Sequence, residues 1–130
     1  MYSPTLLDHF ENPRNAGELP RASVVARVEN PVCADSLVLA LRIEADTVTA
    51  VRFLSKGCVP AMACASLLTT LVEGRNIRDL GSITPAQIAE GVGGLPEGAS
   101  HAAHLALDAL RTALGEHARS EAASKVERHG

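Results

Sequence analysis

The spacing of apolar residues divides the chain into two parts. Between residues 23 and 54 apolar and polar positions alternate, whereas from Gly57 onward apolar residues recur every three or four positions. Alternation with a period of two predicts β-strands, and a period of about 3.6 predicts helices. Because the strands precede the helices, the pattern predicts an α+β domain.

Three strands are predicted in the first part. The alternation covers residues 23–29, 36–44 and 47–54. Ala45-Asp46 separates the last two segments and predicts a tight turn, so these two strands form a hairpin. We expect a three-stranded antiparallel sheet with helices packed on one face.

Helices are predicted at the start of the chain and throughout its second part. Pro4 suits a first helical turn, and Asn12-Pro13 ends that short helix. Helical spacing then predicts a helix over 61–72 that ends at Gly74, and one short turn at 76–80. The capping pair Thr84-Pro85 predicts a helix over 86–90, and Ser100 caps a long final helix. These elements form one domain over residues 1–118. Residues 119–130 are charged and lack an apolar stripe, so we expect a frayed tail.

Composition narrows the class of protein. The chain has 130 residues, only three of them aromatic, and its 12 basic against 15 acidic residues give a net charge of −3. Nucleic-acid binding needs a basic face and usually stacking rings, so it is not expected.

The longest uncharged, mainly apolar run, residues 59–68, is far shorter than the roughly 20 residues of a spanning helix, and no secretory signal is evident. No membrane partner is expected, and three cysteines without paired spacing favour the reducing cytoplasm.

Four residues that can bind metals stand at the ends of predicted elements. Cys33 and Asp35 lie in the connection between two strands, Cys58 opens a helix, and His101 lies in the first turn of the last helix. Element ends are where a rigid scaffold usually presents functional groups.

Several residues of these types also have a structural interpretation. At a helix N-terminus Cys58 is favoured as a thiolate, which binds metal or attacks an electrophile, but a free cysteine is also often a small buried apolar residue. Asp35 could share a cation with Cys33 or simply stabilise a turn. His104 follows His101 by three positions and offers either an auxiliary ligand or one more polar residue on that helix face. Cys64, six residues after Cys58, is expected to pack in the core.

With these positions in view, the sequence resembles the IscU/NifU-type iron–sulfur cluster assembly scaffold family, whose N-terminal domain is called NifU-like. Four motifs carry the resemblance, which covers about residues 2–118: residues 8–17 (DHFENPRNAG), 31–35 (PVCAD), 53–58 (FLSKGC) and 73–89 with the following Leu95-Pro96. The resemblance implies a scaffold that takes iron, and sulfur from a cysteine desulfurase, to build a transient [2Fe–2S] cluster for recipient apoproteins. It also implies that Cys33, Asp35, Cys58 and His101 occupy the pocket, which often holds Zn²⁺ instead.

Three positions depart from the family pattern. Ala102 stands where the pattern has a third cysteine, Ala34 replaces a glycine, and the lysine expected just before His101 is absent. The altered loop before the last helix is where a dedicated Hsp70-type chaperone system binds such scaffolds, so that partnership is not expected.

The remaining donors, two thiols, a carboxylate and an imidazole, suit tetrahedral Zn²⁺ and can also complete a [2Fe–2S] cluster. Three functions follow. The first is a divergent cluster scaffold, which is not an enzyme. The second is a zinc-binding interaction or regulatory protein of the same fold that has lost cluster assembly. The third is thiol chemistry, with Cys58 as a nucleophile or sulfur acceptor and His101 as its base.

Overall fold

The protein folds as one α+β unit, described by a computed structural model over residues 2–30 and 34–129. The chain runs through α1 (Pro4–Glu11), β1 (Val24–Asn30), β2 (Asp35–Glu44), β3 (Thr47–Lys56), α2 (Val59–Val72), the 3-10 helix η1 (Ile77–Ser82), α3 (Pro85–Gly91) and α4 (His101–His129). Each predicted strand and helix is present, so the predicted fold class is confirmed.

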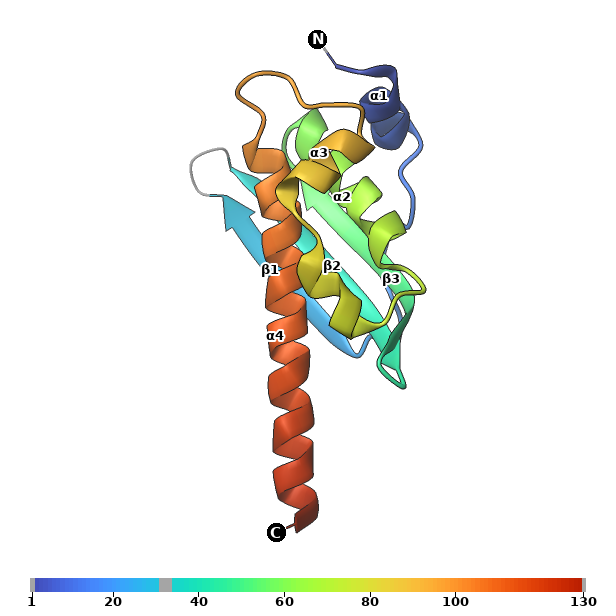
Figure 1. Cartoon of the computed structure of the whole chain (residues 1–130), viewed down its shortest axis with the longest axis vertical. Helices are drawn as coiled ribbons and strands as arrows, with labels where there is room; N and C mark the ends of the chain where they lie inside the picture. The colour runs from blue at the N-terminus through green and yellow to red at the C-terminus, as the bar shows by residue number, and fades with distance from the viewer. Residues whose placement is uncertain (1, 31–33, 130) are drawn as a thin grey trace.

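The sheet is antiparallel with the order β1-β2-β3. Ala45 and Asp46 form the β2–β3 turn with φ angles of 51° and 64°, the left-handed conformation that matches the twist of a two-residue hairpin. Figure 1 shows α2, α3 and α4 on one face of the sheet, with α4 crossing β1. The helices leave the opposite face of the sheet uncovered.

The core lies between the inner face of the sheet and these helices. Apart from Phe53, its large side chains are aliphatic, and they include Leu39, Leu41, Val51, Leu68 and Leu110. The helix α2 is buried on nearly all sides rather than along one stripe, because its many alanines let β3, α1 and α4 approach it closely. Ala102, Ala106 and Ala109 similarly let α4 lie close against the sheet.

A buried polar network fastens α1 and the following loop to α2. Nδ1 of His9 lies 2.8 Å from Oγ of Ser66, and the same Oγ accepts a hydrogen bond from the backbone N–H of Arg14. A neutral His9 ring that carries its proton on Nε2 accepts the Ser66 hydroxyl hydrogen at Nδ1, while the same hydroxyl oxygen accepts from Arg14. Asn15 extends the network by donating to Thr69 Oγ1 and by pairing its backbone with Phe53.

We predict that the protein loses stability as the pH falls because of His9. Burial lowers the pKa of His9 below its usual value, with the Arg14 guanidinium adding to the effect. The folded state therefore favours the neutral ring. The neutral His9 ring contributes to the free energy of unfolding above about pH 6.5, the pKa of histidine in the unfolded chain. This contribution is lost as the pH falls through the lower folded-state pKa. Urea unfolding of the metal-free protein at pH 7.5 and 5.5 measures this loss, and His9→Gln should reduce the difference. An unchanged pH dependence in that variant would assign the effect to another group.

The long helix α4 carries the chain beyond the sheet. It continues as helix through the segment 119–129, and its C-terminal half projects past the other elements, so that the two termini lie at opposite ends of the molecule (Figure 1). Among the described residues, none of the helices is both long and apolar enough to cross a membrane.

Candidate metal centre

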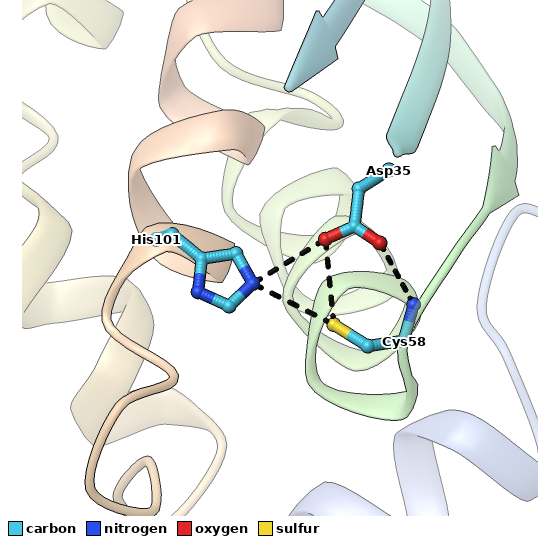
Figure 2. A group of neighbouring side chains, drawn as sticks. All are labelled: Asp35, Cys58 and His101. Atoms are coloured by element: carbon cyan, nitrogen blue, oxygen red, sulfur yellow. Dashed lines mark hydrogen bonds and ion pairs between the residues drawn. The ribbon is translucent and has the colours of Figure 1, made fainter. Parts of the chain in front are cut away.

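Three element ends meet at one end of the sheet and bring three side chains together. Asp35 is the first residue of β2, Cys58 is the N-cap residue of α2, and His101 is the first residue of α4. Figure 2 shows the carboxylate, the thiol and the imidazole pointing toward a common centre. They are the one group of three or more His, Cys, Asp or Glu residues in the described chain whose donor atoms all lie within 4.8 Å of one another.

Asp35 is the buried member of this group, with 2% of its surface exposed. One carboxylate oxygen, Oδ1, accepts a hydrogen bond of 2.9 Å from the backbone N–H of Cys58. The other oxygen, Oδ2, lies 3.5 Å from Cys58 Sγ and 3.3 Å from His101 Nε2. The carboxylate therefore ties β2 to the start of α2 through Oδ1 and offers Oδ2 to the centre.

Gly57 makes room for this arrangement. A Cβ at this position would lie 1.9 Å from Asp35 Oδ1, and the residue has a φ of 136°, which L side chains rarely adopt. Glycine is thus needed both for the turn from β3 into α2 and for the approach of the Asp35 carboxylate to the backbone of Cys58. The sequence places a glycine before Cys58 but gives no sign of this contact.

The spacing of the three donor atoms fits one tetrahedral cation. Zn²⁺ bonds of about 2.3 Å to sulfur and about 2.0–2.1 Å to nitrogen and oxygen imply edges of about 3.3 Å between N and O and about 3.6 Å between S and either. The observed separations are 3.3 Å for N and O, 3.5 Å for S and O, and 3.8 Å between Cys58 Sγ and His101 Nε2. Little movement is needed for all three atoms to bind one ion, and a fourth ligand would complete the site.

The free thiol of Cys58 does not have the lowered pKa that its place at a helix N-terminus predicts. Burial raises the pKa of Cys58, and the neighbouring Asp35 carboxylate adds to the effect, although backbone N–H groups at the start of α2 act in the opposite direction. Without a cation the sulfur is therefore held as a thiol. A bound cation reverses this balance, because it compensates the charges of the carboxylate and the thiolate together.

The other candidate residues stand apart from this group. Cys33 lies outside the described residues. His104 is exposed on α4 and is not part of the cluster, so the structure does not support its role as an auxiliary ligand. Cys64 is fully buried in the core, as predicted, and burial raises the pKa of its thiol to about 12.

Two of the departures from the family pattern are visible in the structure. Ala34 adopts a φ of 55°, a left-handed conformation that costs a non-glycine residue about 1 kcal/mol. Ala102 is fully buried in the core cluster beside His101. Position 102 therefore supplies packing rather than a ligand.

Known proteins share both the sequence and the fold. The model of the NifU-like N-terminal domain matches residues 1–124. The chain belongs to the NifU-like N-terminal domain family. The resemblance carried by the four sequence motifs is thus confirmed.

Named relatives of this NifU-like chain include two scaffold proteins. It is 38% identical over 119 residues to "Iron-sulfur cluster assembly scaffold protein IscU 1" of Archaeoglobus fulgidus, covering 92% of this chain and 78% of the relative. It is 37% identical over 131 residues to the IscU scaffold protein of Aquifex aeolicus, covering 96% and 83%. The crystal structure of a NifU-like protein (N-terminal) from Brucella abortus superposes with a TM-score of 0.74 over 90% of this chain and 94% of that one. Its 18% identity supports the shared fold alone.

Proposed function

We propose that this protein is an iron–sulfur cluster assembly scaffold that builds a transient [2Fe–2S] cluster on Cys58, His101, Asp35 and Cys33. The observation that carries the proposal is the convergence of a thiol, an imidazole and a carboxylate from three different element ends, in a family whose relatives bear that name. Iron and sulfur are cargo in this role. The protein is a carrier rather than a catalyst.

The mixed donor set suits release of the cargo. A [2Fe–2S] cluster needs four ligands and tolerates imidazole at some iron sites. Oxygen and nitrogen ligands bind iron–sulfur clusters less firmly than thiolates do. Asp35 and His101 would therefore make the cluster labile and ready to leave for a recipient apoprotein.

The partners of the scaffold follow from its cargo. Sulfur would come from a cysteine desulfurase and the finished cluster would pass to apoproteins. Cys58 and Cys64 are both free thiols, and such thiols persist in a reducing compartment, so we place the protein in the cytoplasm.

A second function is favoured by one feature of the geometry. The three donor atoms fit a single tetrahedral ion, as in a zinc-binding protein of the same fold, whereas the two irons of a cluster must divide their ligands between them. The third hypothesis, Cys58 as a free nucleophile, is disfavoured by the raised pKa of its thiol.

Anaerobic reconstitution separates these functions. The metal-free protein is incubated with Fe²⁺ and either sulfide or cysteine with a desulfurase, and the visible absorption and circular dichroism spectra are recorded. We expect a cluster chromophore with about two irons per chain, which bleaches as an added apoprotein acquires it. Binding of one Zn²⁺ per chain without any chromophore would reject the scaffold and support the zinc-binding function.

A further inference from the structure

The uncovered face of the sheet has an ordered pattern of side chains. The strand register places residues opposite one another in three rows across β1, β2 and β3: Val25–Ala40–Arg52, Arg27–Val38–Leu54 and Glu29–Ser36–Lys56. These positions alternate with the residues that face the core, so their side chains share the outer face. The first two rows are mainly apolar, with one arginine in each.

The two largest exposed apolar side chains of this face lie on its outer strands, whereas Ala40 on the central strand is buried. Val25 is 55% exposed and Leu54 is 45% exposed, two of the four large apolar side chains that are exposed in the described chain. Val25, Val38, Ala40 and Leu54 line one shallow hollow of about 300 Å³, to which Leu19 also contributes. An apolar patch bordered by charged residues is typical of a surface that binds another protein.

This outer face extends to the end of the sheet at which the metal centre lies. A larger groove of about 800 Å³ shares Arg27, Val38 and Leu54 with the hollow and ends at Ala34 and Asp35. The Asp35 carboxylate is one of the three converging donors. Because Asp35 alternates with Ser36 along β2, its carboxylate projects from the helix-covered side of the sheet. A protein seated on the outer face therefore reaches the cargo by extending around the start of β2.

The charges of the face differ in sign from those of the whole chain. Arg27, Arg52 and Lys56 project from its rows, against one carboxylate there, Glu29, with Glu18 at the border of the hollow. The chain as a whole carries a net charge of −3. A predominantly cationic face on an acidic protein attracts an acidic partner and disfavours pairing with a second copy of the same face.

We propose that this face, defined by the three rows, is the docking surface for the recipient of the cluster, an apoprotein with an apolar centre bordered by carboxylates. The inference rests on the proposed scaffold function. Transfer requires that the recipient's own ligands come close to the cargo, which a partner on this face achieves by extending past the start of β2. The apolar patch supplies binding energy, and the arginines supply attraction and orientation.

The test uses an acidic plant-type apo-ferredoxin as the recipient. Leu54→Ser removes an apolar contact and Arg27→Glu reverses a charge, while neither touches the metal centre. Leu7→Ser on α1, where the side chain is 37% exposed, and Arg111→Glu on the exposed side of α4 are the matched controls. Cluster transfer is followed by circular dichroism, and binding of apo-ferredoxin to the Zn²⁺-loaded protein is measured by calorimetry.

We expect Leu54→Ser and Arg27→Glu each to slow transfer and weaken binding by about 10-fold at low ionic strength, with the controls unchanged. Salt should slow transfer from the wild type more than from Arg27→Glu. Wild-type rates and affinities in both variants would overturn the proposal. Slower desulfurase-driven loading with normal transfer would also overturn it, because the face would then bind the sulfur donor. Loss of a dimer in Leu54→Ser would overturn it as well, because the face would then bind a second copy of the chain. Because the calorimetry needs no cluster, failure of the scaffold function, seen as a missing chromophore, stays distinguishable.

Discussion

Replacement of Cys58 by alanine is expected to weaken Zn²⁺ binding by at least about 100-fold and to prevent formation of the cluster chromophore. The sulfur is one of three donor atoms that already lie at the spacing of a tetrahedral site. Its loss leaves the Asp35 carboxylate and the His101 imidazole, a pair that binds Zn²⁺ weakly without a thiolate. Competition titration with a chromophoric chelator measures the affinity, and anaerobic reconstitution measures the cluster.

Cys64→Ala is the matched control, since it removes the same group six residues further along α2. Cys64 is fully buried among apolar side chains, so this substitution should lower the free energy of unfolding by about 1 kcal/mol through a small cavity. It should leave the Zn²⁺ affinity unchanged. Equal Zn²⁺ affinities for Cys58→Ala and the wild type, or a larger loss in Cys64→Ala, would show that the metal is bound elsewhere.

The sequence predicts most of the fold because its local signals agree with one another. The alternation at 36–44 and 47–54, separated by Ala45-Asp46, specifies a hairpin, and the helix around 86–90 has its capping residue at Thr84. In the structure Thr84 and Gln87 form the full capping box. The helix α2 is less well predicted, since a stripe pattern cannot show that neighbours from several elements bury nearly all of its sides.

The long-range polar contacts cannot be predicted from the spacing of apolar residues or from capping signals. Ser66, Thr69 and Thr70 are the polar residues of an otherwise apolar helix, and the first two are the one local sign of the buried network with His9 and Asn15. Their partners lie more than 50 positions away in the chain. Pairing them requires the docking of α1 on α2, which no sequence period encodes.

The sequence predicts the residues of the candidate metal centre but not the distances between them. Metal-binding residue types at element ends single out Asp35, Cys58 and His101, but their distances depend on how β2, α2 and α4 pack together. The position of Cys58 at a helix N-terminus also predicts a lowered pKa, whereas in the fold burial and Asp35 together raise it. Local electrostatics at a helix end are outweighed here by burial and a tertiary neighbour.

Gly57→Ala is expected to damage both stability and metal binding. A methyl group at position 57 would meet Asp35 Oδ1 and would hold an L residue at a φ of 136°, so we expect a loss of about 3 kcal/mol in the free energy of unfolding, or roughly 10 °C in Tm. Displacing the carboxylate from the N–H of Cys58 also moves Oδ2 away from the centre, so Zn²⁺ affinity should fall by about 10- to 100-fold.

Gly17→Ala separates the cost of the backbone from the cost of the collision. Gly17 has a similar φ of 126°, but a Cβ there would meet no atom within 4 Å. This control should lose about 1 kcal/mol and keep its full Zn²⁺ affinity. Thermal unfolding of the metal-free proteins and chelator competition of the loaded ones provide the two measurements. If both variants lose the same stability and neither loses affinity, the backbone conformation alone explains the glycine, and the Asp35 carboxylate does not depend on it.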